Sequence, residues 1–285
     1  MALPKRPYGK DGVQLSVIGF GGIVVMEEEP AAAARAVGRA VERGVNYFDV
    51  APTYGDAEAK LGPALEPYRK GVFLACKTAQ RSAAGARAEL AASLERLRTD
   101  HLDLYQLHCL QTPQDVDEVF APGGAMEVLC EARRSGQVRY LGFSAHSEQA
   151  ALEAMKRFDF DSVLFPVNFA CWLKNNFGPA VVAEAARRGI SRLALKALAM
   201  QKWPWPKDHP NRRHFHKCWY QPVSQRRQAN LAVRFALSQD ITAAVSPSHE
   251  DLLHLALDTA ENLQPITPAE IAELSSLAAS LDPVM

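Results

Sequence analysis

Short apolar runs alternate with amphipathic, alanine-rich stretches along nearly the whole chain. Residues 30–43 show the helical type clearly, because Ala33, Val37, Ala40 and Val41 recur at helical spacing while arginines occupy the other face. The apolar runs predict strands at residues 12–22, 45–50, 71–77, 102–108, 138–144, 162–167, 190–198 and 241–245. Predicted helices occupy residues 30–43, 82–98, 148–157, 180–188 and 225–237, and another ends near residues 134–136.

This alternation predicts a parallel α/β fold. Eight strands separated by helical stretches at short intervals favour a closed (β/α)8 barrel, the TIM barrel, with a doubly wound open sheet as the alternative. We expect a short N-terminal hairpin and a long loop after the seventh strand, over residues 201–221. Such a barrel takes about 250 residues. No linker divides the chain, so residues 1–285 are expected to form a single domain.

The amino-acid composition bears mainly on the binding partners and the cellular location of the protein. The 32 basic side chains balance 32 acidic ones, which speaks against nucleic acid or an anionic membrane as a partner. No apolar run reaches membrane-spanning length, and residues 1–7 lead into no apolar core of a signal peptide, so we expect a cytoplasmic protein. The five cysteines lie far apart without a CxxC motif, which favours reduced thiols over disulfides or a metal centre.

Polar residues at the ends of the predicted strands carry the candidate chemistry, because barrel active sites form at the carboxyl ends of the strands. Asp49 ends the second strand, Tyr54 follows in the next loop, and Lys77 and His108 end the third and fourth strands. Each residue alone has a purely structural explanation. Asp49 could cap a helix, Tyr54 could pack as an aromatic, Lys77 could be a solvated charge at the rim, and His108 could be a hydrogen-bonded core histidine. Neighbouring strands lie about 4.8 Å apart. The joint occurrence at successive strand ends therefore favours an active site.

In this arrangement Asp49 keeps Lys77 charged and in place. The lysine in turn is expected to lower the pKa of the Tyr54 phenol from its ordinary value near 10. A tyrosine of that kind can donate a proton to a carbonyl oxygen at neutral pH. His108 would orient the carbonyl or share the proton relay.

Three segments resemble the aldo-keto reductase family, and the resemblance extends over essentially the whole chain. They are VNYFDVAPTYG at residues 45–55, LDLYQLH at 102–108 and RYLGFS at 139–144. The resemblance implies a catalytic tetrad of Asp49, Tyr54, Lys77 and His108. It also implies reduction of aldehydes or ketones to alcohols by hydride transfer from a nicotinamide cofactor, with the tyrosine as general acid.

The resemblance is less complete at the cofactor site. Gly21 and Gly22 match a loop that lines the cofactor, and Ser144 matches a serine that holds the nicotinamide carboxamide. The asparagine common beside that serine is Ala145 here, so we expect His146 to take its place. The glutamine usual on the sixth strand is also absent, and Asn168 is expected to compensate.

The ends of the last two strands complete the expected cofactor contacts. These contacts are Lys196, Ser246, Ser248 and His249. No Arg or Lys follows Gln239, where the family often has an arginine for the adenosine 2′-phosphate. The resemblance implies NADP(H) as the cofactor, and the absence of this cation leaves NAD(H) as the open alternative.

Residues 201–221 are rich in tryptophan and basic residues. We expect this segment to cover the barrel mouth and to bind the cofactor phosphates or an acidic or aromatic substrate. The alternatives are a surface excursion that packs its own aromatics, a zinc site and a nucleic-acid site. Its tryptophans are Trp203, Trp205 and Trp219.

Two other functions compete with a carbonyl reductase. One is a non-catalytic, cofactor-binding regulatory or sensor subunit, because family members of that kind can retain the tetrad. The other is a barrel metallohydrolase that uses Asp49, His108 and His146, although paired histidines on one strand are absent. The expected partner is a small carbonyl or alcohol substrate, without nucleic acid or membrane. The oligomeric state stays open.

Overall fold

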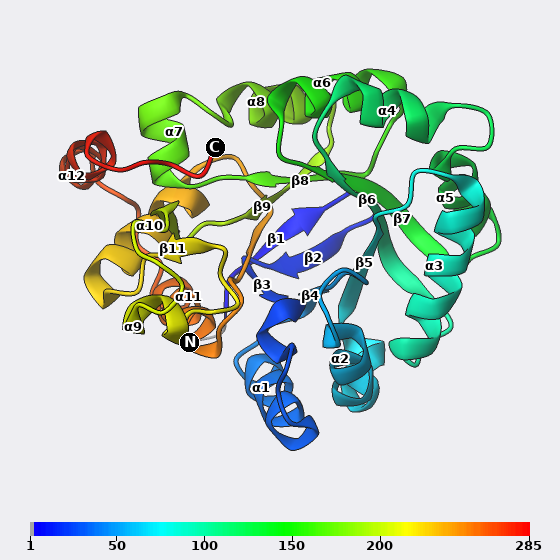
Figure 1. Ribbon diagram of the computed structural model, residues 1–285, viewed down its shortest axis with the longest axis horizontal. Helices are drawn as coiled ribbons and strands as arrows, with labels where there is room; N and C mark the ends of the chain where they lie inside the picture. The colour runs from blue at the N-terminus through cyan, green and yellow to red at the C-terminus, as the bar shows by residue number, and fades with distance from the viewer. Residues whose placement is uncertain (1–2) are drawn as a thin grey trace.

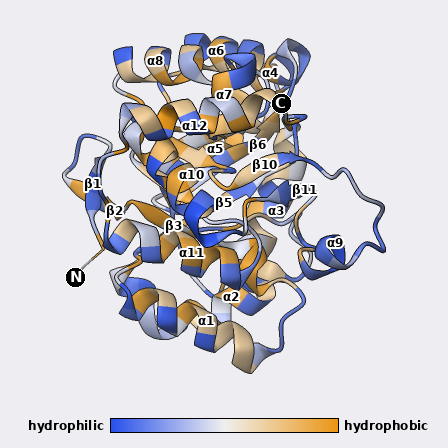
Figure 2. Ribbon diagram, turned by 90° about the vertical axis from the view of Figure 1, so that its left-hand side faces the viewer, coloured by the Kyte–Doolittle hydropathy of each residue, from blue (hydrophilic) through white to orange (hydrophobic). Residues whose placement is uncertain are grey.

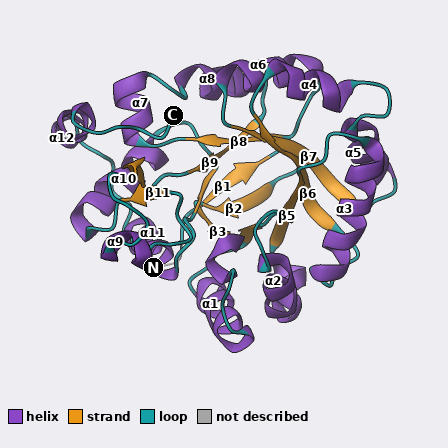
Figure 3. Ribbon diagram, in the orientation of Figure 1, coloured by secondary structure: helices purple, strands orange, loops and turns teal. Residues whose placement is uncertain are grey.

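The computed structural model describes residues 3–285 as a closed parallel barrel surrounded by helices (Figures 1 and 3). Around the barrel the strand order is β12-β3-β4-β5-β6-β7-β8-β9. The strands are β3 (Ile18–Gly21), β4 (Tyr47–Asp49), β5 (Phe73–Thr78), β6 (Leu102–Leu110), β7 (Val138–Ala145), β8 (Ser162–Pro166), β9 (Ser191–Leu195) and β12 (Ala243–Val245). The (β/α)8 prediction is confirmed.

The helices form the outer layer, and Figure 2 shows polar and apolar residues mixed along each of them. They are α1 (Pro30–Glu42), α2 (Ala57–Leu65), α3 (Ala83–Arg96), α4 (Pro113–Phe120), α5 (Ala125–Arg134), α6 (Glu148–Arg157), α7 (Phe169–Asn175), α8 (Pro179–Arg187), α10 (Arg226–Ser238), α11 (Glu250–Glu261) and α12 (Pro268–Ala279). Two short 3₁₀ helices, η1 (Gly22–Val25) and η2 (Glu66–Gly71), follow β3 and α2. The sequence pattern did not predict α2, α7, α11 and α12.

The predicted N-terminal hairpin closes one end of the barrel. It consists of β1 (Lys5–Tyr8) and β2 (Val13–Ser16), which are antiparallel, so the run predicted at 12–22 divides between β2 and β3. Tyr8 is fully buried, with its ring centroid 4.9 Å from that of Phe73, and its hydroxyl donates to Ser162 Oγ at 3.0 Å. Phe73 and Ser162 begin β5 and β8. The hairpin therefore lies at the amino ends of the strands, opposite the mouth.

The long loop after β9 has secondary structure of its own. β10 (Ala199–Lys202) and β11 (Tyr220–Pro222) form an antiparallel pair, and α9 (Pro210–His214) lies between them. Figure 2 shows α9 and the segment leading to it as hydrophilic and projecting from the side of the barrel. Within residues 3–285 no helix has the length and apolar character needed to cross a membrane.

Candidate active site

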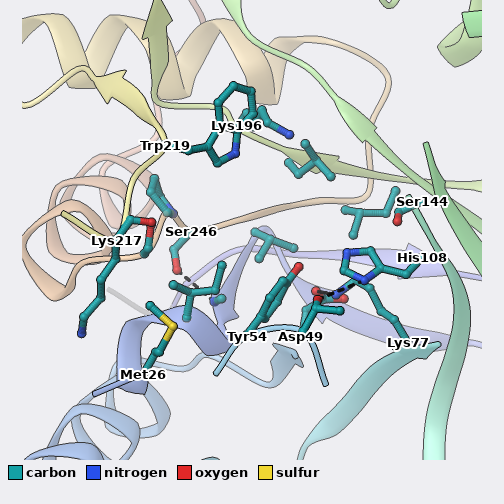
Figure 4. A pocket seen from close by; sticks show the side chains of 18 of the residues that line it. Met26, Asp49, Tyr54, Lys77, His108, Ser144, Lys196, Lys217, Trp219 and Ser246 are labelled. Carbon is teal, nitrogen blue, oxygen red and sulfur yellow. Dashed lines mark hydrogen bonds and ion pairs between the residues drawn. The ribbon is translucent and has the colours of Figure 1, made fainter. Parts of the chain in front are cut away.

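The four residues expected to form a tetrad meet in one pocket at the carboxyl ends of the strands (Figure 4). Asp49 is the last residue of β4, Lys77 lies near the end of β5, and His108 lies near the end of β6. These strands are neighbours in the barrel. Tyr54 comes from the loop between β4 and α2 and lines the same pocket.

A buried ion pair forms the base of the pocket. The Lys77 ammonium contacts the Asp49 carboxylate and donates to Val50 O at 3.0 Å. The other Asp49 oxygen accepts hydrogen bonds from Tyr47 Oη at 3.2 Å and from Gln106 Nε2 at 3.0 Å. Burial opposes the charge on Lys77, but the adjacent carboxylate outweighs it and raises the pKa of the lysine above its ordinary 10.5. Lys77 is therefore held as a cation.

The pKa of Tyr54 corrects one expectation from the sequence. The Lys77 ammonium lies 5.1 Å from the centroid of the tyrosine ring, as expected for a coupled pair. Burial nevertheless raises the pKa of Tyr54 above 10, and the positive charge of Lys77 only reduces that rise. The phenol is therefore protonated at neutral pH, which is the form that can donate.

His108 stands edge-on to Tyr54, with ring centroids 5.7 Å apart and an interplanar angle of 84°. Its Nδ1 lies 3.4 Å from Thr53 Oγ1. Burial, followed by the positive charge of Lys77, lowers the pKa of His108 to about 3. The imidazole is therefore neutral at physiological pH, with one nitrogen as donor and the other as acceptor.

Six of the nine residues expected at the cofactor line this pocket. These residues are Gly21, Ser144, His146, Lys196, Ser246 and Ser248. The structure does not bring the other three into it. Gly22 begins η1, Asn168 is fully buried and caps α7 by accepting from Cys171 N at 2.9 Å, and His249 Nε2 accepts from Lys217 N at 3.2 Å.

Glycine, serine and lysine residues line one side of the pocket. Gly21 N donates to Ser246 Oγ at 3.0 Å, and a Cβ on Gly21 would lie only 2.4 Å from Ser246 O, so glycine is needed for this close approach. Ser248 and Lys217 lie alongside, with Ser248 Oγ donating to Lys217 O at 3.0 Å. Hydroxyl and ammonium donors of this kind suit phosphate oxygens. The residues present therefore fit a nicotinamide dinucleotide.

The loop that contains residues 201–221 reaches the pocket through only part of its length. Trp219 lines the pocket, whereas Trp203 Nε1 donates to Cys218 O at 2.8 Å and Trp205 stacks on His209 with ring centroids 4.2 Å apart. Trp203 and Trp205 therefore pack within the loop. The sequence alone could not distinguish the three.

Lys217 ties the loop to the segment after β3. Its ammonium donates to Glu28 Oε1 at 2.6 Å and to Val24 O at 3.2 Å. Of the basic residues in the loop, Lys217 lines the pocket, whereas Arg212 donates to Trp205 O at 2.7 Å within the loop itself.

Two residues that support Asp49 were not singled out from the sequence, although a signal for them exists. Tyr47 precedes Asp49 by two positions, and Gln106 precedes His108 by two. Residues two apart on a strand face the same side. A polar residue two positions before a candidate catalytic residue therefore points to the same site.

Comparison with known proteins places this barrel in a family. A model of the Aldo/keto reductase family matches residues 17–279. The chain belongs to the aldo-keto reductase family. Within residues 3–285, this aldo-keto reductase has no group of three His, Cys, Asp or Glu side chains able to hold a metal ion.

Curated relatives are similar over part of their length. An uncharacterized oxidoreductase of Bacillus subtilis is 29% identical over 56% of this chain and 55% of its own length. The 6-dehydroglucose reductase of Novosphingobium aromaticivorans is 35% identical over 49% of this chain and 50% of its own. The aldo-keto reductase described here thus spans about half the length of the curated relatives it matches.

A solved structure matches the whole barrel. The holo form of an aldo-keto reductase from Bacillus halodurans covers 98% of this chain and 98% of its own, with a TM-score of 0.75 and 24% sequence identity. At this identity the match establishes the shared fold.

Proposed function

We propose that this chain is a nicotinamide-dependent oxidoreductase that reduces small aldehydes or ketones to alcohols. One observation carries the proposal: a protonated Tyr54 shares a pocket with the buried Lys77–Asp49 ion pair and a neutral His108. These groups can deliver a proton to a carbonyl oxygen and stabilise the charge left behind.

The protein side of the reaction is a proton transfer at Tyr54 Oη. The substrate carbonyl oxygen accepts a hydrogen bond from this hydroxyl and a second one from the neutral imidazole of His108. As the phenol gives up its proton, the Lys77 ammonium stabilises the phenolate. Asp49 keeps the ammonium in place through their ion pair.

The cofactor, NADP(H) or alternatively NAD(H), would supply the hydride. Ser144 and His146 would hold its nicotinamide end, and Gly21, Ser246 and Ser248 would line the rest of it. Gly22, Asn168 and His249 are not proposed as contacts, because none of them lines the pocket.

Tyr54→Phe tests the proposal. Loss of a general acid typically lowers turnover by about 10²–10⁴-fold, whereas cofactor affinity should stay within a few-fold because the dinucleotide keeps its contacts. Turnover is measured as NADPH or NADH oxidation with a panel of carbonyls, and affinity by fluorescence titration. The panel includes an oxidised sugar, because one relative is named a 6-dehydroglucose reductase.

Tyr68→Phe is the matched control, since Tyr68 lies in η2, outside the pocket, and its loss should leave turnover unchanged. Near-normal turnover in Tyr54→Phe would remove that residue as the acid. Tight cofactor binding by the wild type without turnover of any carbonyl would instead favour the non-catalytic sensor.

A further inference from the structure

Lys196 is a buried lysine without an acidic partner. It follows β9, lines the pocket, and is only 8% exposed. The other two lysines of the pocket are paired with carboxylates, Lys77 with Asp49 and Lys217 with Glu28. Among residues 3–285 no carboxylate forms an ion pair with Lys196, and its ammonium contacts a neutral acceptor, His146 Nε2, at 2.7 Å. A buried charge normally has a counter-ion.

The surroundings of Lys196 leave its ammonium free to bind more. A lysine ammonium has three N–H donors, and His146 accepts one of them. The Trp219 ring lies over the ammonium, 5.3 Å from its centroid, and is 57% exposed at the pocket mouth. Lys196 also has φ of 65°, a left-handed conformation that costs free energy for a side chain other than glycine. The fold holds this lysine in a strained conformation and leaves two donors unused.

His146 connects Lys196 to the reacting end of the pocket. His146 Nδ1 lies 3.1 Å from the sulfur of Cys109, the residue after His108, and Cys109 N donates to Ser144 Oγ at 2.8 Å. The hydroxyl-lined part with Ser246 and Lys217 is a separate region. Figure 4 shows Lys196 with Trp219 on one side of the pocket, Lys217 on another, and Tyr54 with Asp49 on a third.

We propose that Lys196 and Trp219 bind the carboxylate of an oxo acid, so that the preferred substrates are carbonyl compounds that carry a carboxylate. This inference rests on the proposed carbonyl reduction. The carboxylate accepts the two unused N–H donors, and the indole covers the apolar part of the substrate.

The electrostatics of the site agree with this assignment. Burial lowers the pKa of Lys196 to about 7. The titratable groups coupled to Lys196 are His146, His108, Cys109 and Cys171, and no carboxylate is among them. A bound carboxylate would favour the charged form of Lys196, which gives an acid substrate an advantage over its uncharged ester.

The test compares para-carboxybenzaldehyde with its methyl ester. We expect the wild type to prefer the acid, and Lys196→Met to lower the acid-to-ester ratio of kcat/KM by about 10–100-fold, the worth of one or two charge-assisted hydrogen bonds. Lys196→Arg keeps the positive charge and should retain most of the preference. Lys207→Met, an exposed lysine of the same loop, is the control and should leave the ratio unchanged.

Two outcomes overturn the inference. One is a wild type that shows no preference for the acid. The other is a Lys196→Met variant in which kcat/KM falls equally for both substrates and NADPH affinity also falls. Lys196 would then hold the cofactor diphosphate.

If neither these aldehydes nor any carbonyl of the panel is reduced, the proposed function fails, and a binding measurement tests the carboxylate site separately. The probe is then para-(hydroxymethyl)benzoate, and the readout is quenching of tryptophan fluorescence. Quenching that is lost in Lys196→Met supports the site, and equal quenching in both proteins refutes it.

Discussion

Lys77→Met tests whether the buried ion pair organises the site. Both side chains of the Lys77–Asp49 pair are at most 3% exposed. Methionine fills the space of the lysine stem but has no charge. The Asp49 carboxylate would keep its hydrogen bonds from Tyr47 and Gln106, at 3.2 and 3.0 Å, and lose its counter-ion.

Removing one partner of a buried pair costs about 3–5 kcal/mol. Because Asp49 keeps two hydrogen-bond donors, the decrease in the free energy of unfolding should lie near the lower limit, about 3 kcal/mol. A protein of this length loses roughly 2 °C of Tm per kcal/mol, so Tm should fall by about 6 °C. Adding Asp49→Asn removes the unpaired charge and should recover about half of that loss, whereas turnover stays low in both variants.

Thermal unfolding followed by circular dichroism, together with NADPH oxidation, gives both readouts. The pKa of Lys77 is raised in the folded state, so its stabilisation is complete below the ordinary 10.5 and is lost only as pH rises through the higher folded value. The difference in Tm between wild type and Lys77→Met should therefore be the same at about pH 6 and about pH 9. A double variant no more stable than the single one would refute the reasoning.

Three further perturbations follow from the fold and the pocket. Burial and Lys77 lower the pKa of His108 to about 3, so as pH falls the unfolded chain binds this proton before the folded one does. The free energy of unfolding therefore rises with pH between about 3 and 6.5. Tm should fall between about pH 7 and pH 5, and it should fall less in His108→Gln. Tyr8→Phe should cost about 1 kcal/mol and Tyr8→Ala about 3–5 kcal/mol in urea unfolding, and equal losses would contradict the packing role of the ring. Trp219→Ala should lower kcat/KM for a bulky aldehyde about 10–200-fold more than for a small one, whereas Trp203→Ala should lower Tm and leave that ratio unchanged.

The barrel could be predicted because its strands are short apolar runs, each buried by the helices around it. Two of the elements that escaped prediction, the β10–β11 hairpin and α7, lack a comparable signal. The hairpin of β10 and β11 lies in a segment of mixed aromatic and basic residues without a period of two. α7 has seven residues, too few to show a helical repeat.

The same limits explain the outcome at the site. Strand ends indicated which polar residues meet, since parallel strands place their carboxyl ends together. Asn168 was assigned to the cofactor because the helix that it caps, α7, was not predicted. The pKa of Tyr54 was expected to fall because the sequence names the neighbouring charge of Lys77, whereas only the structure shows how strongly burial opposes it.

The N-terminal hairpin has a consequence for the order of events. Tyr8 is packed beneath the strands and closes the amino end of the barrel, so the pocket with Tyr54 is approached from the carboxyl end. Under the proposed function, a dinucleotide and a carbonyl compound would both enter and leave from that end. The proposed function then predicts ordered binding, in which the ligand that lies deeper in the pocket binds first and leaves last.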